Sequence, residues 1–274
     1  MLERFLLSRN SLDANERSAP RSDIALNRIG RPANWGAGAT LALSLLSAIG
    51  ITMAQGIGVL PVILYRFNHF KGKRTEDWAV ILEELATQGL TLSLSIYSGG
   101  IAAVFFVILW STLRGWSWLD YLAIRGFSWK SFRIGFAGLA IFLVLTYPSG
   151  EAADQRSGDF AVQAYQTAVF PFLFITALVA VAPIWEELFF RGFMHRGLAA
   201  AWGPIPAIIF CSACWAMVHV QYDYSLILVL FLVGIFFGFT RQLSGSTLLT
   251  VLLHASMNGV AIIEMIVHAG SVAN

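Results

Sequence analysis

Long apolar segments separated by short polar stretches fill most of the chain. Each segment approaches the ~20 residues that a helix needs to cross the ~30 Å hydrocarbon core of a bilayer, and a helix satisfies its own backbone hydrogen bonds in lipid. The segments lie at residues 35–65, 91–112, 133–147, 166–190, 204–220, 225–241 and 246–266. We therefore predict an all-α fold, a polytopic transmembrane helical bundle of seven spans, or of eight if the long first segment is double.

Polar stretches divide the chain into regions. Residues 72–90 place apolar and acidic side chains on different sides of a helix, which predicts an amphipathic segment on the membrane surface. A polar N-terminal tail, the N-terminal spans, a C-terminal helical core and a short C-terminal tail are expected at residues 1–33, 34–164, 165–266 and 267–274, respectively.

The composition supports an integral membrane protein. Of the 274 residues, 57% are hydrophobic and 12% are charged, whereas soluble domains carry about 25% charged residues. The net charge of +2 comes without a Lys/Arg-rich run, so we expect lipid contacts and no nucleic-acid partner. The arginines of the tail favour a cytoplasmic N-terminus in a bacterial inner membrane, although Lys71, Lys73 and Arg74 then fall on the opposite side if the first segment is one span.

The stretch WEELFFR, residues 185–191, places three formal charges inside an apolar segment. Ionisable residues at membrane depth are unfavourable by a few kcal/mol each, and they usually pair or line a functional cavity. On a helix Glu187 lies ~40° from Arg191, so these two can neutralise each other. Glu186 lies ~140° from Arg191 and has no partner on its own helix, which makes it a candidate proton acceptor.

The following spans offer polar partners for Glu186. A turn is predicted at AWGPIP, residues 201–206, and Glu186 and His219 lie at similar distances before and after it, so the two side chains can face each other. His254 and Asn258 are one helical turn apart and are suited to hold an oxyanion. Counting along the helices, however, offsets the depth of His254 from that of His219 by up to about two turns.

Each of these side chains also has a simpler interpretation. A buried histidine is more often a packing residue, and a Glu–Arg pair can be an interhelical clamp. Trp215 lies one turn before His219 and is predicted to pack beside it and to exclude water. The coincidence of a depth-matched Glu and His with a His and an Asn on one face favours a site over packing alone.

Three motifs occur in order along the chain: Glu186-Glu187-x-x-x-Arg191, Trp215-x-x-x-His219 and His254-x-x-x-Asn258. They resemble the EExxxR, FxxxH and HxxxN motifs of the CPBP family of intramembrane proteases. This family is named for its CAAX-processing and bacteriocin-processing members and includes the Ras-converting-enzyme type. Trp215 stands where the family usually has Phe. The resemblance covers residues 165–266, which would form the catalytic core, and residues 1–160 carry no motif that we can assign.

The resemblance implies an intramembrane endopeptidase that acts on a peptide or a membrane-protein substrate. Water activated by Glu186 and His219 would attack the scissile bond, with His254 and Asn258 stabilising the oxyanion. Supporting roles would fall to Glu187, Arg191 and Trp215. The alternative is a non-catalytic membrane protein, such as a transporter or an immunity factor, that binds a peptide in the same cavity.

Involvement of a metal stays open at this point. Glu and His can ligate zinc, and Glu186, His219 and His254 would then be the ligands. The zincin motif HExxH is absent, however, and activation of water by Glu and His needs no metal. We favour a site without a tightly bound metal.

Overall fold

The computed structural model describes residues 34–69, 84–85, 87–146 and 155–272, and within these ranges it is helical and contains no strand. The residues from Gly36 onwards form one compact unit. The predicted tail, 1–33, and most of the amphipathic segment predicted at 72–90 lie outside the described residues.

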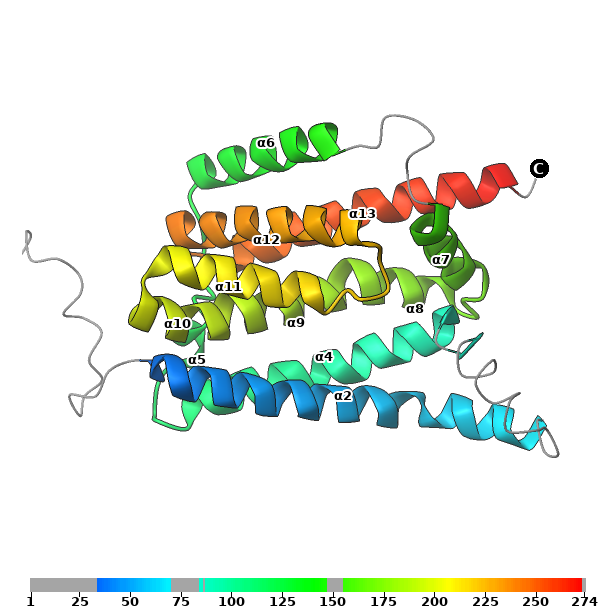
Figure 1. Ribbon diagram of the computed structural model, residues 1–274, viewed down its shortest axis with the longest axis horizontal. Coiled ribbons are helices and arrows are strands. Elements are labelled where there is room, and N and C mark those ends of the chain that lie inside the picture. Colours follow the sequence, from blue (N-terminus) through cyan, green and yellow to red (C-terminus); the bar gives the residue numbers. More distant parts are fainter. Residues whose placement is uncertain (1–33, 70–83, 86, 147–154, 273–274) are drawn as a thin grey trace, which may run out of the picture. The chain divides into compact units, whose positions relative to one another are not determined.

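The long helices of this unit run back and forth along one direction (Figure 1). They are α2 (Gly36–His69), α4 (Gly89–Thr112), α6 (Trp129–Thr146), a segmented helix from Pro171 to Trp202, α11 (Pro204–Met217), α12 (Tyr224–Ser244) and α13 (Thr247–Val272). Shorter helices, α5 (Trp118–Tyr121) and α7 (Gln155–Gln166), lie at opposite ends of the bundle (Figure 1). The last helix, α13, continues through Val272, into the residues assigned to the C-terminal tail.

In the described part of the chain, six helices are long and apolar enough to cross a membrane. The seventh, α11, has 14 residues, which at 1.5 Å per residue is about 21 Å and shorter than the ~30 Å hydrocarbon core. The long first segment forms the single helix α2, with Pro61 inside it. The prediction of seven or eight spans is therefore not confirmed, and it differs from the structure at residues 204–220.

Local signals set the ends of the last helices. Gly203 has a φ of 84°, and Pro204 occupies the first turn of α11, which confirms the turn predicted at 201–206. The Asp223 carboxylate accepts from the backbone N–H groups of the first turn of α12, fixing where that helix begins. Gly245, with a φ of 69°, ends α12.

Small residues bring α11 and α12 into close contact. A Cβ added to Gly238 would lie 2.6 Å from the Ile208 side chain, and one added to Gly234 would lie 2.9 Å from the Ser212 side chain. Such small residues allow helices to approach closely in lipid, where packing drives helix association. The approach brings α12 against the centre of the bundle, where the polar residues lie.

Two π-helical turns interrupt the long helix that carries WEELFFR. Its parts are α8 (Pro171–Thr176), η2 (Ala177–Val181), α9 (Ala182–Glu187), η3 (Leu188–Met194) and α10 (His195–Trp202). Pro183 explains the first interruption, because its ring clashes with the carbonyl four residues earlier in an α-helix. Accordingly, the Ala182 N–H donates to the carbonyl of Ala177, five residues back. Such turns are frequent at functional sites.

Candidate active site

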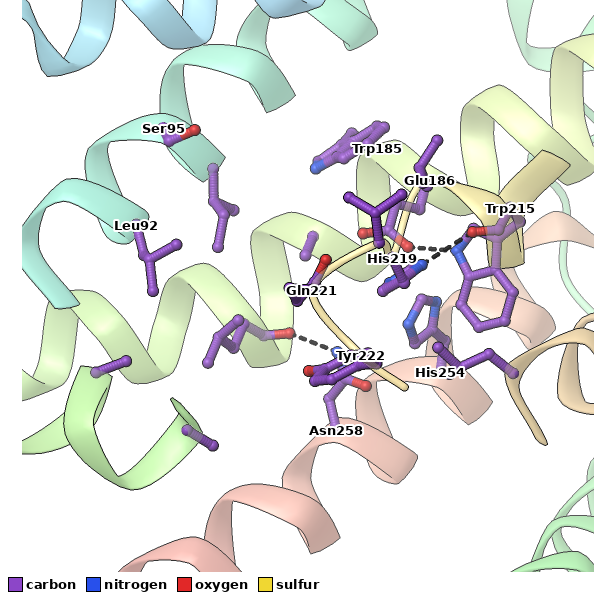
Figure 2. Close-up of a pocket in the computed structure, with 18 of the residues that line it drawn as sticks. Leu92, Ser95, Trp185, Glu186, Trp215, His219, Gln221, Tyr222, His254 and Asn258 are labelled. Carbon is purple, nitrogen blue, oxygen red and sulfur yellow. Dashed lines mark hydrogen bonds between the residues drawn. The ribbon is translucent and has the colours of Figure 1, made fainter. Parts of the chain in front are cut away.

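A cavity of about 940 Å³ lies inside the bundle, between α2, α4, α7, α9 and α13 and the connection from α11 to α12. Among its lining residues are Glu186, Trp215, His219, His254 and Asn258. Figure 2 shows Glu186, Trp215, His219 and His254 grouped at one end of the cavity, with Asn258 beside Tyr222. The structure thus brings all four predicted catalytic residues to one cavity.

Glu186 is 7% exposed, and its partner comes from another helix. The indole N–H of Trp215, on α11, donates to Glu186 Oε2 at 2.5 Å. The prediction that Glu186 has no partner on its own helix is consistent with this arrangement. Trp215 does more than the packing expected of it, because its hydrogen bond fixes the position of the carboxylate.

His219 lies beyond the end of α11, in the connection to α12, and not on a helical span as predicted. Because α11 ends at Met217, the His219 backbone N–H donates to the Ala216 carbonyl at 3.1 Å. His219 Nδ1 lies 2.9 Å from the Trp215 carbonyl, an acceptor that a longer helix would have used itself. A carbonyl only accepts, so Nδ1 carries the hydrogen, and the Nε2 lone pair is the basic atom of the neutral ring.

Glu187 and Arg191 together connect their own helix to α12 and α13. Arg191 Nη1 lies 2.8 Å from Glu187 Oε1, which confirms the predicted pair. The same oxygen accepts from His254 Nδ1, on α13, at 3.0 Å. Arg191 also donates to the Gly234 carbonyl on α12, at 3.3 Å. The contact between His254 and Glu187 was not predicted, because a contact between distant helices has no local sequence signal.

The rings of His219 and His254 both contact the ring of Trp215. Their centroids lie 5.2 Å and 5.3 Å from that of Trp215, each in an edge-on arrangement. The predicted depth offset of up to two turns is therefore wrong. It assumed that His219 sits on a continuous helix, whereas the chain leaves α11 before His219. The Arg191 guanidinium covers the Trp215 ring at 4.7 Å, so Trp215 lies at the centre of the polar group.

Asn258 donates from Nδ2 to the Leu178 carbonyl at 2.8 Å. Leu178 lies in the π-helical turn η2, and the residue five positions later is Pro183, which has no N–H to donate. Asn258 therefore satisfies a carbonyl that the helix leaves open. Nδ2 carries two hydrogens, so the second remains for another acceptor. Asn258 and His254 both line the cavity, as expected for two residues on one face of a helix.

Asn258→Ala should destabilise the protein by roughly 1 kcal/mol, the lower end of the range for a lost partner, because the carbonyl that loses its donor is part-buried. The matched background is Pro183→Ala, which restores an N–H that can bond to the Leu178 carbonyl. Asn258→Ala should destabilise that background less. Unfolding free energies of the four proteins, measured by denaturing-detergent titration in micelles, check this. An equal effect in both backgrounds would contradict our explanation of η2.

The connection between α11 and α12 contributes lining residues that the sequence did not indicate. Gln221 and Tyr222 lie at the cavity beside the predicted set (Figure 2). Burial raises the pKa of the Tyr222 hydroxyl and the charge of Glu186 adds to this, whereas a hydrogen bond with Gln221 acts the opposite way. The Tyr222 ring also stacks on His219, at 6.2 Å between centroids. Tyr222 therefore lines the cavity as a neutral side chain, close to Glu186 and His219.

The geometry does not fit the zinc site considered above. Among the described residues, no group of three His, Cys, Asp or Glu side chains is arranged to hold a metal, and this includes Glu186, His219 and His254.

Comparison with known proteins adds an independent finding. Residues 168–260 match the model of the Rce1-like family, described as type II CAAX prenyl endopeptidase Rce1-like. These residues form an Rce1-like domain. The match agrees with the resemblance drawn from the three motifs and includes every site residue described above. The family is one of CAAX-type intramembrane proteases, and with six helices able to cross a bilayer, the Rce1-like domain indicates an integral membrane protease. No curated protein and no solved structure matched the chain.

Proposed function

We propose that the protein is an intramembrane endopeptidase that hydrolyses a peptide bond with a water activated by Glu186 and His219. The supporting observation is that the Rce1-like domain gathers Glu186, His219 and His254 around one ring, that of Trp215, at a cavity within the bundle. A cavity of about 940 Å³ is at the large end of the ~300–1,000 Å³ range of ligand sites, and it has room for a peptide segment.

In the first step, water loses a proton to the Glu186 carboxylate as its oxygen attacks the carbonyl carbon of the scissile bond. Trp215 holds one oxygen of Glu186, which leaves the other for the water. The Nε2 lone pair of His219 accepts the second hydrogen of the water and orients it. Glu186 is held by Trp215 from another helix, and His219 is held by the Trp215 carbonyl one turn earlier, so Trp215 positions both side chains.

The negative charge that develops on the substrate oxygen would be stabilised by two donors on α13. Asn258 offers the second hydrogen of its amide nitrogen, and His254 offers Nε2–H when its ring is protonated. Glu187 holds the other nitrogen of that ring. Collapse of the tetrahedral intermediate breaks the carbon–nitrogen bond, and the proton taken up by Glu186 passes to the leaving amine.

We further propose a bacterial inner membrane with the N-terminus of α2 on the cytoplasmic side. The end of the bundle where α2 and α6 begin also holds α5, α10 and the end of α12 (Figure 1). Exposed cations gather in the described segment between α4 and α6 and in the first turns of α6: Arg114, Arg125, Lys130 and Arg133. Short basic loops favour the cytoplasmic side.

His219→Ala should lower the rate of peptide hydrolysis about 10²-fold, because it removes a group that orients the water and shares its proton. The measurement uses the full chain in proteoliposomes and internally quenched peptides. One peptide ends in a prenylated Cys-aliphatic-aliphatic-X sequence and a second is identical but not prenylated. Cleavage and binding are followed separately.

Met217→Ala is the matched control, because Met217 is an exposed residue at the end of α11 that does not line the cavity. We expect it to retain the wild-type rate. Binding of a peptide by the wild type without cleavage would instead favour a non-catalytic peptide-binding protein. Cleavage by His219→Ala at the wild-type rate would argue against the mechanism.

A further inference from the structure

Three arginines meet at the end of the bundle away from the catalytic cavity. Arg125 lies in the segment between α5 and α6, Arg196 lies on α10, and Arg241 lies in the last turn of α12. The positive charges of Arg125 and Arg196 repel that of Arg241. None of the three lines the cavity that holds Glu186 and His219.

Hydrogen bonds from the start of α13 hold this arrangement together. The Thr247 hydroxyl accepts from Arg241 Nε at 2.9 Å and donates to the Leu122 carbonyl at 2.6 Å. The Ser246 hydroxyl donates to the Arg125 carbonyl at 2.5 Å. These bonds attach the segment before α6 to the α12–α13 turn, so the backbone of Arg125 is held close to the turn that carries Arg241.

Arg196 is attached to the same segment from the other side. Its Nη1 donates to the Asp120 carbonyl at 3.1 Å, and its guanidinium lies 5.0 Å from the centroid of the Tyr121 ring. The Asp120 carboxylate attracts the Arg196 guanidinium electrostatically. Among the described residues, Arg125 acts as a like charge on both Arg196 and Arg241.

Arg241 is the most buried of the three arginines. It is 8% exposed, and among the described residues the ion pairs are those of Glu187 with Arg191 and with His254, so Arg241 has no carboxylate partner there. His195 beside it is also buried, and its Nε2 has no hydrogen-bond partner within the described ranges. A buried charge facing like charges is unfavourable unless an anion completes the group.

Aromatic residues show that this end of the bundle is at the lipid–water boundary. Trp118, Trp129 and Trp202 are exposed there, on α5, α6 and α10. Tryptophans with this exposure form the belts that mark the headgroup level of a membrane. An anion that reaches the three arginines at this level is therefore a lipid headgroup rather than a solute of the aqueous phase.

We propose that Arg125, Arg196 and Arg241 bind the phosphate of an anionic phospholipid. Guanidinium groups bind phosphate through pairs of parallel hydrogen bonds, and anionic lipids are attracted to basic residues next to the spans. The bound lipid neutralises Arg241 and holds the α12–α13 turn against the segment before α6. The site is separate from the proposed proteolysis, so either can be correct without the other.

The test titrates the purified full chain, in a neutral detergent, with phosphatidylglycerol or phosphatidylcholine and follows the thermal unfolding temperature. Phosphatidylglycerol should raise it for the wild type, and phosphatidylcholine should not. Arg125→Gln should weaken the apparent affinity about fivefold, as expected for one basic residue at a membrane surface. Arg125 is exposed, so this variant removes a charge without disturbing a buried contact. Arg241→Gln should weaken the affinity at least as much.

Arg133→Gln is the matched control, because Arg133 is an exposed cation on α6 at the same end. We expect its affinity to stay close to that of the wild type, because Arg133 is not among the charges that act on Arg241. Equal weakening by Arg133→Gln and Arg125→Gln would overturn the proposed site in favour of diffuse attraction. Stabilisation by inorganic phosphate as strong as that by phosphatidylglycerol would overturn the lipid as the ligand.

Discussion

Glu186→Gln is expected to lower peptide hydrolysis by about 10³- to 10⁴-fold, near the upper limit for the loss of a general base. Glutamine keeps the shape of the side chain, and its carbonyl can still accept the hydrogen bond from Trp215 that the carboxylate accepts now. It cannot take a proton from water. Initial rates and peptide affinities in proteoliposomes check this, and the affinity should stay close to that of the wild type.

The matched control is Glu264→Gln, an exposed carboxylate on α13 outside the cavity. Its rate should equal that of the wild type. If Glu186→Gln were as active as Glu264→Gln, the general base would have to be another group. If instead Glu186→Gln fully replaced the wild type in cells, binding rather than hydrolysis would be the activity that matters.

Arg191→Leu is expected to destabilise the folded protein by roughly 3–5 kcal/mol, the range for removing one partner of a buried ion pair. Arg191 is 1% exposed, and Glu187, which is fully buried, would keep the hydrogen bond from His254 but lose its arginine. The carbonyl of Gly234 would also lose its donor on Arg191. Denaturing-detergent titration in micelles measures the loss.

The double variant Glu187→Gln/Arg191→Leu separates the ion pair from the packing around it. Because it removes both charges, its loss of unfolding free energy should be smaller than the sum of the losses of the two single variants. The difference should be about 1 kcal/mol or more, as expected for residues in contact. Arg133→Leu, on the exposed face of α6, is the matched arginine. Additive effects of the two site variants would show that the pair contributes little to stability.

Local rules were enough to predict much of this fold. Apolar length predicted the helices, Gly203 and Pro204 predicted the turn before α11, and helical spacing predicted the pair of Glu187 with Arg191, all of which depend on residues close together in sequence. The end of α11 at Met217 was not predicted. The residues after it, 218–223, contain no Gly or Pro to mark a helix end. The Asp223 carboxylate caps the start of the next helix, α12.

The contacts made by His254 and Asn258 show where sequence reasoning stops. Pro183 alone implies that a carbonyl one turn before it lacks a donor. Nothing near Pro183 indicates that the donor is Asn258, 80 positions after Leu178. In the same way, His254 and Glu187 are 67 positions apart. The relative rotation of packed helices decides both contacts, and that rotation depends on the close approach of α12 at Gly234 and Gly238.

The position of Arg191 on the same helix as Glu187 also matters during biosynthesis. A membrane helix leaves the ribosome and enters the bilayer before later helices have been made. Because Glu187 and Arg191 are one turn apart, the helix can enter lipid with these two charges already neutralised. His254 reaches Glu187 only after α12 and α13 have followed. The pair therefore allows insertion of a segment whose remaining partners do not yet exist.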